Sequence, residues 1–363
     1  MLSTPHGEVE TPAFMPVGTQ ATVKGLLPES LRQVGTTMLL ANTYHLALRP
    51  GPDIVRSLGG LHAFMAWDGP ILTDSGGFQA FSMADRVKWS EAGILFKSHL
   101  DGSMLNLSPE SAVAFQESLG ADVVMCLDEC PALPASKEKI AEAVGRTIRW
   151  AKRCKEAQTR TDQGLFGIAQ GGGHEDLRAE CVEALVALDF PGYAVGGVSV
   201  GEGREEVRKA LDMTVHRLPE DKPRYLMGVG RPADLLDAVA SGVDLFDCVL
   251  PTRNGRNATC LTATGTVKMR NAIHKRDPRP IEDGCDCPAC ARFSRAYVRH
   301  LFLAGEMLGP ILASLHNLAY LHRLMREVRE AISEGRFVPY RRKALEALGA
   351  ETVHYPFAPI PPG

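Results

Sequence analysis

A carboxylate followed by guanidiniums stands in the second half of the chain. The segment Val243–Arg256 reads VDLFDCVLPTRNGR: a short apolar run ends at Asp247, and a cationic, glycine-bearing loop follows with Arg253 and Arg256. An acid at the end of a buried strand can attack an electrophilic carbon, and guanidiniums just beyond it can hold an anionic substrate. An aspartate in such a place can equally cap a turn or a helix. Other residues must therefore decide between the two interpretations.

Several other apolar runs also end in polar or glycine residues. They lead into Asp74, Asp128, Gln170, the pair Gly196-Gly197, and Gly228. If the runs are parallel strands, their carboxyl ends meet at one face, and these residues meet there too. Paired carboxylates suit displacement at an anomeric carbon, with one as the nucleophile and the other as acid and then base. Phe78 and Met227 could sandwich a flat heterocycle, or they could simply fill the core.

Three cysteines form the strongest local signal. Cys285, Cys287 and Cys290 stand in the turn CDCPAC, and this spacing predicts a tetrahedral Zn²⁺ site that needs a fourth ligand. The candidates for that ligand are His274, His300, His316 and His322. An iron–sulfur cluster would usually want a fourth cysteine. Three thiolates and one imidazole make a closed structural site, since a catalytic zinc keeps one position open.

The elements that must position these residues alternate along the chain. Eight apolar runs lie at 12–17, 37–41, 70–73, 122–127, 165–169, 193–195, 224–227 and 243–246. Helical patterns lie between several of them, at 136–159, 174–188, 204–217 and 232–241. Eight near-continuous apolar strands alternating with helices predict a (β/α)₈ barrel. A doubly wound open sheet is the alternative, but its first strand should lead into a glycine-rich nucleotide turn, and here VGTQATVKG follows.

Three divisions follow from this alternation. Residues 1–251 are predicted to form the barrel, with an insertion at about 83–107 where polar and apolar residues alternate around Asp101-Gly102, a hairpin signal. Residues 252–320 should form a basic loop and a zinc-binding subdomain after strand eight. Residues 321–363 should form a C-terminal helix that closes the barrel, followed by a proline-rich tail.

Composition limits the class of protein. The chain has 363 residues, 45% hydrophobic and 23% charged, which is typical of a globular enzyme. It has no apolar run long enough for a transmembrane helix and no secretion signal at its start. Its nine cysteines predict reduced thiols and a cytoplasmic protein. Between residues 252 and 300, ten Lys and Arg face four Asp and Glu, against a net charge of −3 for the whole chain. This patch indicates a polyanion-binding face, although a solvated surface would look the same.

These motifs together resemble a known family. The chain is similar to the bacterial type of tRNA-guanine transglycosylase from about residue 11 to about residue 335. The matching motifs are TPAFMPVGTQATVKG, ANTYHL, LTDSGGFQ, FKSHLDGS, DECP, GIAQGG, GYAVGGVSVGE, YLMGVG, FDCVLPTRNGRN, CDCPAC, and RAYVRHLFLAGE with LHN after it. The resemblance implies a (β/α)₈ barrel with an inserted zinc subdomain. It implies that guanine at the wobble position of a GUN anticodon is exchanged for 7-aminomethyl-7-deazaguanine (preQ1), a step in queuosine formation.

The resemblance also implies roles for individual residues. Asp247 matches the nucleophile that bonds covalently to the ribose, and Asp74 matches the general acid and base. The residues that match the base-binding set are Asp128, Gln170, Gly197, Val198, Ser75 and the stacking pair Phe78 and Met227. Arg253 and Arg256 match positions suited to flanking nucleotides. The zinc ligands implied are Cys285, Cys287, Cys290 and His316, which selects one histidine from the four candidates. A homodimer is implied as well.

The chain departs from the family pattern in two places, and three rival functions fit its residues less well. Some family members have Tyr where Phe78 stands, and the N-terminal lead-in common in the family is expected to be short or absent. Cys130 and Val200 match the bacterial pattern and favour preQ1 over the bulkier queuine of eukaryotic relatives. A non-catalytic tRNA-binding subunit would have lost acids that this chain keeps. A barrel glycosidase would not explain Gln170, the stacking pair or the basic patch, and a zinc hydrolase would need an open metal site.

Overall fold

Eight parallel strands close into a barrel, as the sequence predicted. The computed structural model describes residues 1–77, 87–98, 100–132, 134–198 and 203–350. The barrel strands are β3 (Ala13–Gly18), β4 (Leu39–Ala41), β5 (Ile71–Thr73), β9 (Val123–Met125), β10 (Gly164–Ala169), β11 (Gly192–Val195), β12 (Arg224–Leu226) and β13 (Leu245–Cys248). Each pairs in parallel with its neighbour in this order, and β13 pairs with β3 to close the ring. The (β/α)₈ class is thereby confirmed, and the doubly wound sheet is excluded.

Side-chain alternation along the strands builds two apolar layers. One buried cluster fills the inside of the barrel and takes alternate strand residues: Ala13, Met15, Val17, Met38, Leu40, Leu72, Val123, Met125, Phe166, Ile168, Ala194, Tyr225 and Leu245. The residues between them face outward and join a second cluster that includes Leu39, Ile71 and Leu226. Because successive side chains of a strand point to opposite faces, both sides of each strand are covered, which is why the strands read as continuous apolar runs.

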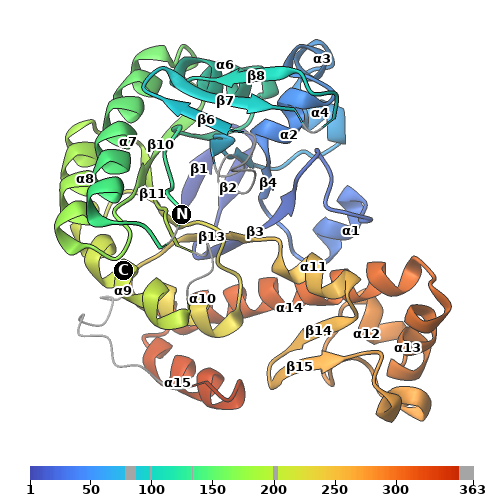
Figure 1. Cartoon of the computed structure of the whole chain (residues 1–363). Coiled ribbons are helices and arrows are strands. Elements are labelled where there is room, and N and C mark those ends of the chain that lie inside the picture. The colour runs from blue at the N-terminus through green and yellow to red at the C-terminus, as the bar shows by residue number, and fades with distance from the viewer. Residues whose placement is uncertain (78–86, 99, 133, 199–202, 351–363) are drawn as a thin grey trace.

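Helices cover the outside of the barrel (Figure 1). They are α1 (Pro28–Gln33), α2 (Thr43–Leu48), α3 (Pro52–Ser57), α4 (Gly60–Met65), α6 (Pro109–Leu119), α7 (Lys137–Ala157), α8 (Glu175–Ala187), α9 (Arg204–Thr214), the 3₁₀ turn η2 (Val215–Arg217) and α10 (Pro232–Ala240). Helices α6 and α7 begin where sequence rules place a start, because the Ser108 and Ser136 hydroxyls accept hydrogen bonds from the backbone of the first turn. The helical patterns at 136–159 and 174–188 thus correspond to α7 and α8.

An antiparallel sheet follows strand β5. Its strands are β6 (Val87–Ser90), β7 (Gly93–Lys97) and β8 (Met104–Leu107). The turn between β7 and β8 contains Asp101, whose carboxylate accepts hydrogen bonds from the backbone and hydroxyl of Ser103. This is the position at which the sequence predicted a hairpin turn. Residues 83–86 and 99 of the predicted insertion lie outside the described residues.

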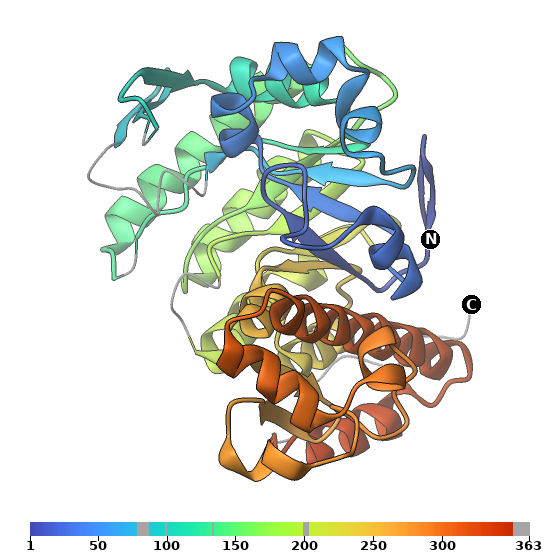
Figure 2. The same ribbon diagram turned by 90° about the vertical axis from the view of Figure 1, so that its right-hand side faces the viewer.

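The C-terminal third packs against the barrel through one long helix. After β13 come α11 (Leu250–Arg256), β14 (Thr259–Thr262), β15 (Gly265–Lys268), η3 (Ala272–Arg276), α12 (Pro288–Arg292), α13 (Arg295–Ala304), α14 (Leu308–Ser333) and α15 (Phe337–Ala347). Figure 2 shows α14 lying between the barrel and the subdomain that contains α12 and α13. The predicted boundary at 320/321 falls inside α14, so the subdomain and the barrel-closing segment share one helix.

The segment beyond Asp247 differs from the expected loop. It forms helix α11, with Pro251 in its first turn, where a missing N–H costs no hydrogen bond. A Cβ at Gly255 would lie 2.6 Å from the Ser314 hydroxyl, so only glycine lets α11 lie this close to α14. The prediction of a loop here was therefore wrong. Gly255 allows α11 to pack closely against α14 and does not interrupt the helix.

The N-terminal hairpin lies apart from the other strands. It consists of β1 (Leu2–Thr4) and β2 (Gly7–Val9) and sits at the right-hand edge of Figure 2, on the side opposite the β6–β7–β8 sheet. Within the described part of the chain, no helix combines the length and the apolar character needed to cross a bilayer.

Candidate active site

The inward register of the strands carries the polar residues to the mouth of the barrel. Leu72, Ile168, Ala194, Tyr225 and Leu245 point into the barrel. Two residues further along each strand direction stand Asp74, Gln170, Gly196, Met227 and Asp247. Since side chains alternate with a period of two, these positions share the inward direction and form the next layer, at the carboxyl ends of the strands. The strand register thus explains why residues far apart in sequence gather here.

Asp247 is held by one of its two oxygens. The Tyr225 hydroxyl donates to Oδ1 over 2.5 Å, and the Gly228 N–H donates to the same oxygen over 2.7 Å. Its second oxygen accepts no hydrogen bond from the described residues. Burial raises the pKa of Asp247 to about 6; the bonds from Tyr225 and Gly228 lower it, and the charge of Asp74 raises it. The side chain is therefore mostly ionised at neutral pH, fixed in direction, and free at one oxygen.

Asp74 is fixed by the segment that follows strand β4. The Asn42 side-chain amide donates to Oδ2, and the Thr43 N–H donates to Oδ1 over 2.8 Å. The Thr43 hydroxyl donates to the Asp74 backbone carbonyl over 2.5 Å. Both carboxylate oxygens are thus oriented by donors from the neighbouring strand end, which fixes the rotamer of this acid.

Asp128 and Gln170 form a polar pair inside the mouth. The Gln170 Nε2 donates to Asp128 Oδ2 over 2.7 Å. Burial raises the pKa of Asp128 to about 6, against the lowering effect of the Gln170 bond, and the charges of Asp74 and Glu129 raise it further. The Gln170 Oε1 is buried and accepts no hydrogen bond from any described residue. An unmet buried acceptor beside a buried carboxylate fits a planar ligand that offers several donors.

Asp74 lies close enough to Asp128 and to Asp247 for its charge to act on both. The charge of Asp74 raises the pKa values of both Asp128 and Asp247, and it also contributes to the raised pKa of Tyr225. The three acids come from the ends of β5, β9 and β13. Their convergence agrees with the prediction made from the strand ends.

The remaining predicted pocket residues take different places. Gly197 lies against Gln170, because a Cβ there would be 2.5 Å from Oε1, and its φ of +67° also disfavours any side chain. Val198 and Ser75 are buried, and the Ser75 hydroxyl accepts from the Gly77 N–H over 3.3 Å. Met227 is half-buried against the inner cluster. Its predicted stacking partner Phe78 lies outside the described residues, as does Val200.

Three residues that sequence reasoning assigned no role support the acids. Tyr225 and the pair Asn42-Thr43 make the closest contacts to Asp247 and Asp74. The motifs YLMGVG and ANTYHL contain them, so their place in the sequence was visible. Asn42 directly follows β4, and Tyr225 points inward from β12 beside β13. Tracing the inward register of every strand could have found both.

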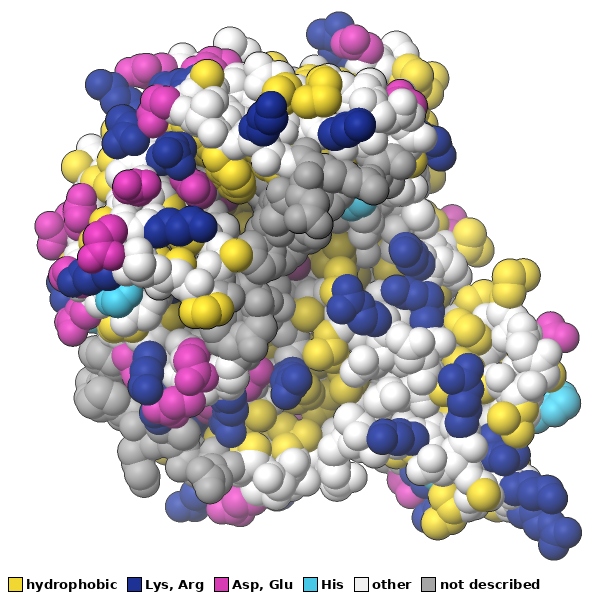
Figure 3. All heavy atoms as spheres, in the orientation of Figure 1, with side chains coloured by type: hydrophobic (Ala, Val, Ile, Leu, Met, Phe, Trp, Pro, Cys, Tyr) yellow, Lys and Arg dark blue, Asp and Glu magenta, His cyan; other side chains and the backbone are white. Residues whose placement is uncertain are grey.

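The two arginines predicted to face a polyanion lie on α11. Arg253 is exposed and Arg256 is half-buried. Burial and the neighbouring charge of Arg253 lower the pKa of Arg256, and its Nη1 is buried without a partner among the described residues. Figure 3 shows Lys and Arg side chains beside the hollow of this face and over the C-terminal subdomain. An exposed cation next to a partly desolvated one suits contacts to phosphates.

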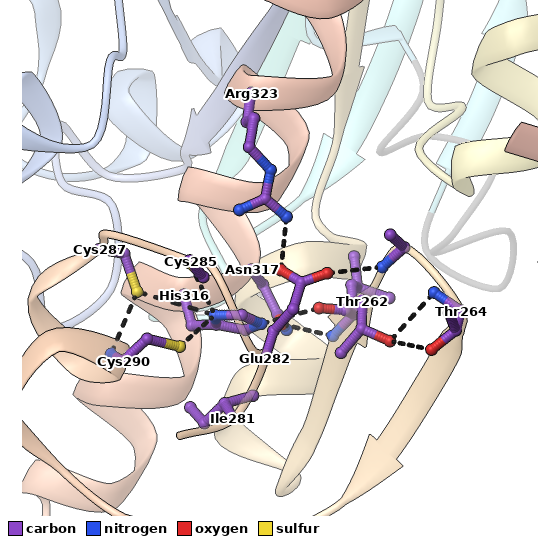
Figure 4. A network of polar contacts seen from close by, with 12 residues as sticks. Thr262, Thr264, Ile281, Glu282, Cys285, Cys287, Cys290, His316, Asn317 and Arg323 are labelled. Carbon is purple, nitrogen blue, oxygen red and sulfur yellow. Dashed lines mark hydrogen bonds and ion pairs between the residues drawn. The ribbon is translucent and has the colours of Figure 1, made fainter. Parts of the chain in front are cut away.

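The three cysteines and His316 converge in the C-terminal subdomain (Figure 4). The His316 Nδ1 lies 3.7 Å from the sulfurs of Cys285 and Cys287 and 3.3 Å from that of Cys290. All four side chains are buried. The His316 Nε2 lies 2.8 Å from the Leu261 carbonyl in β14. Donation from Nε2 to that carbonyl leaves the Nδ1 lone pair facing the sulfurs, as metal ligation requires.

This geometry fits a tetrahedral ion. Ligand bonds of about 2.3 Å to sulfur and 2.0–2.1 Å to nitrogen place tetrahedral neighbours roughly 3.6 Å apart. The observed sulfur–nitrogen distances of 3.3–3.7 Å bracket that value. His322, another of the four candidates, instead approaches the Thr36 hydroxyl at 2.9 Å. The buried cluster can thus bind one metal ion through four protein ligands.

Fold and site together define the class of protein. Buried carboxylates at the carboxyl mouth of a closed parallel barrel are the arrangement of barrel enzymes, and the cysteine cluster belongs to the separate C-terminal subdomain.

Comparison with known proteins identifies the family. The profile of the queuine tRNA-ribosyltransferase family matches residues 1–350. A queuine tRNA-ribosyltransferase of Pelotomaculum thermopropionicum is 55% identical over 341 residues, covering 94% of this chain and 92% of the relative. Proteins of the same description from Lysinibacillus sphaericus and Thermus thermophilus are each 54% identical, covering 96% and 94% of this chain and 92% and 89% of the relatives. The chain belongs to the queuine tRNA-ribosyltransferase family and is a transferase of the pentosyltransferase class.

Proposed function

We propose that the protein exchanges guanine at the wobble position of GUN anticodons in tRNA for preQ1, through a covalent bond between Asp247 and the ribose. The observation that carries this proposal is the state of Asp247. Its carboxylate is buried and mostly ionised at neutral pH, and two donors hold one oxygen while the other faces no donor among the described residues. A nucleophile needs this combination of fixed direction and available lone pairs.

The exchange proceeds in two displacements. The free oxygen of Asp247 bonds to C1′ of the ribose as the bond from C1′ to N9 of guanine breaks, and Asp74 gives its proton to the departing base. In the second step Asp74 takes the N9 proton of the incoming base. That nitrogen then bonds to C1′, and the Asp247 carboxylate is released. Two inversions at C1′ restore the original configuration.

Asp128 and Gln170 would recognise the base that enters the pocket. The Asp128 carboxylate can accept from the ring N–H and the exocyclic amine, an edge that guanine and preQ1 share. The Gln170 amide keeps a second N–H for the base carbonyl, and the Gly197 N–H can donate to the same atom. The Val198 carbonyl would accept from the aminomethyl group of preQ1, and Ser75 lies beside the catalytic Asp74. Phe78 and Met227 are proposed as the stacking pair.

The anticodon loop must open for this reaction. The glycosidic bond is reached only when the base leaves the stack and enters the mouth of the barrel. Arg253 and Arg256 lie on α11, which begins three residues after Asp247, so they stand where the flanking phosphates would pass. The positive C-terminal subdomain extends this surface. Binding should therefore weaken steeply with added salt.

The buried cysteine cluster is proposed to hold one structural Zn²⁺. Cys285, Cys287, Cys290 and His316 fill a tetrahedral shell, so the ion would supply folding energy and no open position for chemistry. Its ligands come from α12, the turn before it, and α14. The ion would tie the basic subdomain to the helix that packs against the barrel.

Three further properties are proposed from the family. A homodimer agrees with the exposed apolar side chains of Ile273, Leu303 and Met307 on and beside the C-terminal subdomain. Mass measurement by analytical ultracentrifugation would show twice the chain mass, and a monomer at all concentrations would contradict it.

A cytoplasmic location agrees with the nine cysteines, which are all free of disulfides. Preference for preQ1 over queuine is proposed from Cys130 and Val200, and incorporation of the two bases can be compared directly.

Covalent capture tests the central claim. Wild-type protein is mixed with an unmodified anticodon stem-loop and quenched on a denaturing gel, where a shifted band should mark the protein–RNA bond. Asp247→Asn should give no band, because a neutral amide cannot attack C1′. The matched control is Asp244→Asn, at the opposite end of the same strand, where the Arg224 N–H donates to the carboxylate over 2.9 Å. This control should form the adduct as wild type does.

An undiminished adduct in Asp247→Asn would reject the assignment of the nucleophile. Exchange of radiolabelled guanine into unmodified tRNA, with and without preQ1, tests the reaction itself. Label should enter the tRNA and be expelled again by preQ1, and no incorporation into a GUN-containing tRNA would reject the proposed activity.

A further inference from the structure

A completely buried arginine lies behind two loops of the base pocket. Arg178 is the fourth residue of α8, and none of its surface is exposed. The loop after β10 contains Gln170 and the loop after β11 contains Gly197, the two residues proposed to recognise the carbonyl of the base. A guanidinium keeps its charge even when it is buried, so it must be stabilised by acceptors around it. The acceptors of Arg178 belong to these same loops.

The guanidinium of Arg178 links three segments of the fold. Its Nε donates to the Gly172 carbonyl over 2.7 Å, in the loop that follows β10. Its Nη2 donates to the Gly196 carbonyl over 3.3 Å, directly after β11. Its Nη1 donates to the Thr214 hydroxyl over 3.3 Å, at the end of α9. One side chain thus holds the two pocket loops to each other and to the helix behind them.

The bond to the Gly196 carbonyl also sets the direction of the next amide. This carbonyl and the Gly197 N–H belong to one planar trans peptide, so they point in opposite directions. Because the carbonyl is directed at Arg178 on the outer helix, the N–H is directed away from that helix. It donates to no described residue, whereas the Gly196 N–H donates to the Ala169 carbonyl over 3.0 Å. A peptide between two glycines rotates easily, so the bond from Arg178 restrains it.

A second contact from α8 holds the other half of the pocket. The Cys181 sulfur accepts a hydrogen bond from the Gln170 backbone N–H over 3.3 Å. Cys181 lies three residues after Arg178, so the two side chains share one face of α8. A Cβ at Gly171 would lie 2.6 Å from Cγ of Arg178, and the φ of this glycine is +145°. Only glycine therefore allows the loop to pack this closely on the arginine.

We propose that Arg178 is a positioning residue that determines the selectivity of the pocket for a base with a carbonyl group, an inference that rests on the proposed base exchange. Its guanidinium holds the peptide between Gly196 and Gly197 so that the N–H faces the base carbonyl. A charged donor on the carbonyl of a peptide also polarises the N–H of that peptide, which makes this N–H a stronger donor. Arg178 acts on the base only through the loops that it holds.

Exchange kinetics with two bases test this inference. Guanine and 6-thioguanine share the ring N–H and the exocyclic amine, but sulfur is a weaker acceptor than the carbonyl oxygen that it replaces. Wild type should therefore incorporate guanine into tRNA with the higher kcat/KM. Arg178→Met should raise the KM for guanine by about tenfold and change kcat much less. It should also lower the preference for guanine over 6-thioguanine by about threefold or more.

Arg178→Lys keeps the charge but loses the fork of donors, so its preference for guanine should lie between those of wild type and Arg178→Met. Arg341→Met is the matched control, because it removes another buried arginine, which pairs with Asp237 in α10. Thermal melting should show a loss of stability in both methionine variants, but Arg341→Met should keep the wild-type KM and the wild-type preference for guanine.

A wild-type preference for guanine in folded Arg178→Met would overturn the inference and leave the proposed exchange intact. If Arg178→Met does not fold, Arg178→Lys decides in the same way, and an unchanged preference there would overturn the inference. A wild-type protein that incorporates no guanine into tRNA would instead reject the proposed exchange itself.

Discussion

Removal of one hydroxyl group should move the pH dependence of the enzyme. In Tyr225→Phe, Asp247 loses the donor 2.5 Å from Oδ1 and keeps the Gly228 N–H at 2.7 Å. The ring of Tyr225 is fully buried in the inner cluster of the barrel, and phenylalanine keeps that ring. The substitution therefore changes the stability of the Asp247 anion and leaves the packing of the barrel unchanged.

The size of the pKa shift follows from the free energy that one hydrogen bond contributes. A hydrogen bond to a charged group contributes roughly 1.5–3 kcal/mol, and 1.36 kcal/mol corresponds to one pKa unit. Because the Tyr225 bond lowers the pKa of Asp247, its loss should raise that pKa by about 1–2 units from its value of about 6. At pH 7 the ionised fraction would fall from about nine tenths to between about one half and one tenth.

The assay is guanine exchange measured as kcat/KM from pH 5.5 to 9. Only ionised Asp247 can attack, so wild-type activity should fall as the pH drops through about 6. The variant should lose activity through about 7–8, with a two- to tenfold deficit at pH 7 that nearly disappears at pH 9. Tyr193→Phe is the matched control, because its buried hydroxyl accepts from the Phe190 N–H and does not touch Asp247. A deficit of equal size at every pH, with an unshifted midpoint, would refute the reasoning.

Three further substitutions test the pocket, the metal cluster and the core. Gly196→Ala would place a Cβ 2.6 Å from Gln170 Nε2, so the KM for preQ1 should rise by about tenfold or more in steady-state assays; an unchanged KM would show that Gln170 does not contact the base. Cys290→Ala removes one of four metal ligands, and atomic absorption and calorimetry should show loss of metal and a lower melting temperature; full metal content would exclude the cluster. Arg341→Met breaks a 2.6 Å ion pair with buried Asp237. Because Arg204 still pairs with Asp237, the loss in urea denaturation should stay below the roughly 3–5 kcal/mol of an unpaired buried charge, and exposed Arg342→Met should cost almost nothing.

Much of the fold could be predicted because the strands are covered on both faces. Each strand of the barrel overlaps one of the eight apolar runs in the sequence. The reason is that the inner and the outer layer both require apolar side chains. The gathering of Asp74, Asp128 and Asp247 was predicted from the strand ends, and the inward period of two accounts for Asp74 and Asp247 but not for Asp128, which lies three residues beyond inward-facing Met125. The spacing of the cysteines in CDCPAC alone predicted a metal cluster. It did not decide which of four histidines is the fourth ligand, and the choice of His316 came from the family resemblance.

Contacts between distant segments could not be predicted in this way. Sequence spacing says nothing about the partner of a side chain in another strand, so the bonds from Tyr225 to Asp247 and from Asn42 to Asp74 were missed. The segment that forms α11 was expected to be a loop because glycine usually disfavours helices. Only the close approach of α14 explains why glycine stands at position 255. The contact between His6 and Asp122 depends on the hairpin of β1 and β2 returning to the amino end of β9, which no local pattern indicates.

The interaction between Asp74 and Asp247 explains how one acid can serve both directions of the proposed exchange. The charge of Asp74 raises the pKa of Asp247, and an electrostatic coupling of this kind acts equally in the other direction. When Asp247 bonds to the ribose it loses its charge, so the proton affinity of Asp74 falls just as Asp74 gives its proton to guanine. When the incoming base attacks, the Asp247 carboxylate forms again and the proton affinity of Asp74 rises as it takes the N9 proton. The Asn42 and Thr43 donors hold both oxygens of Asp74, so in the proposed exchange the changing charge of Asp247 would favour its change of role without a change of rotamer.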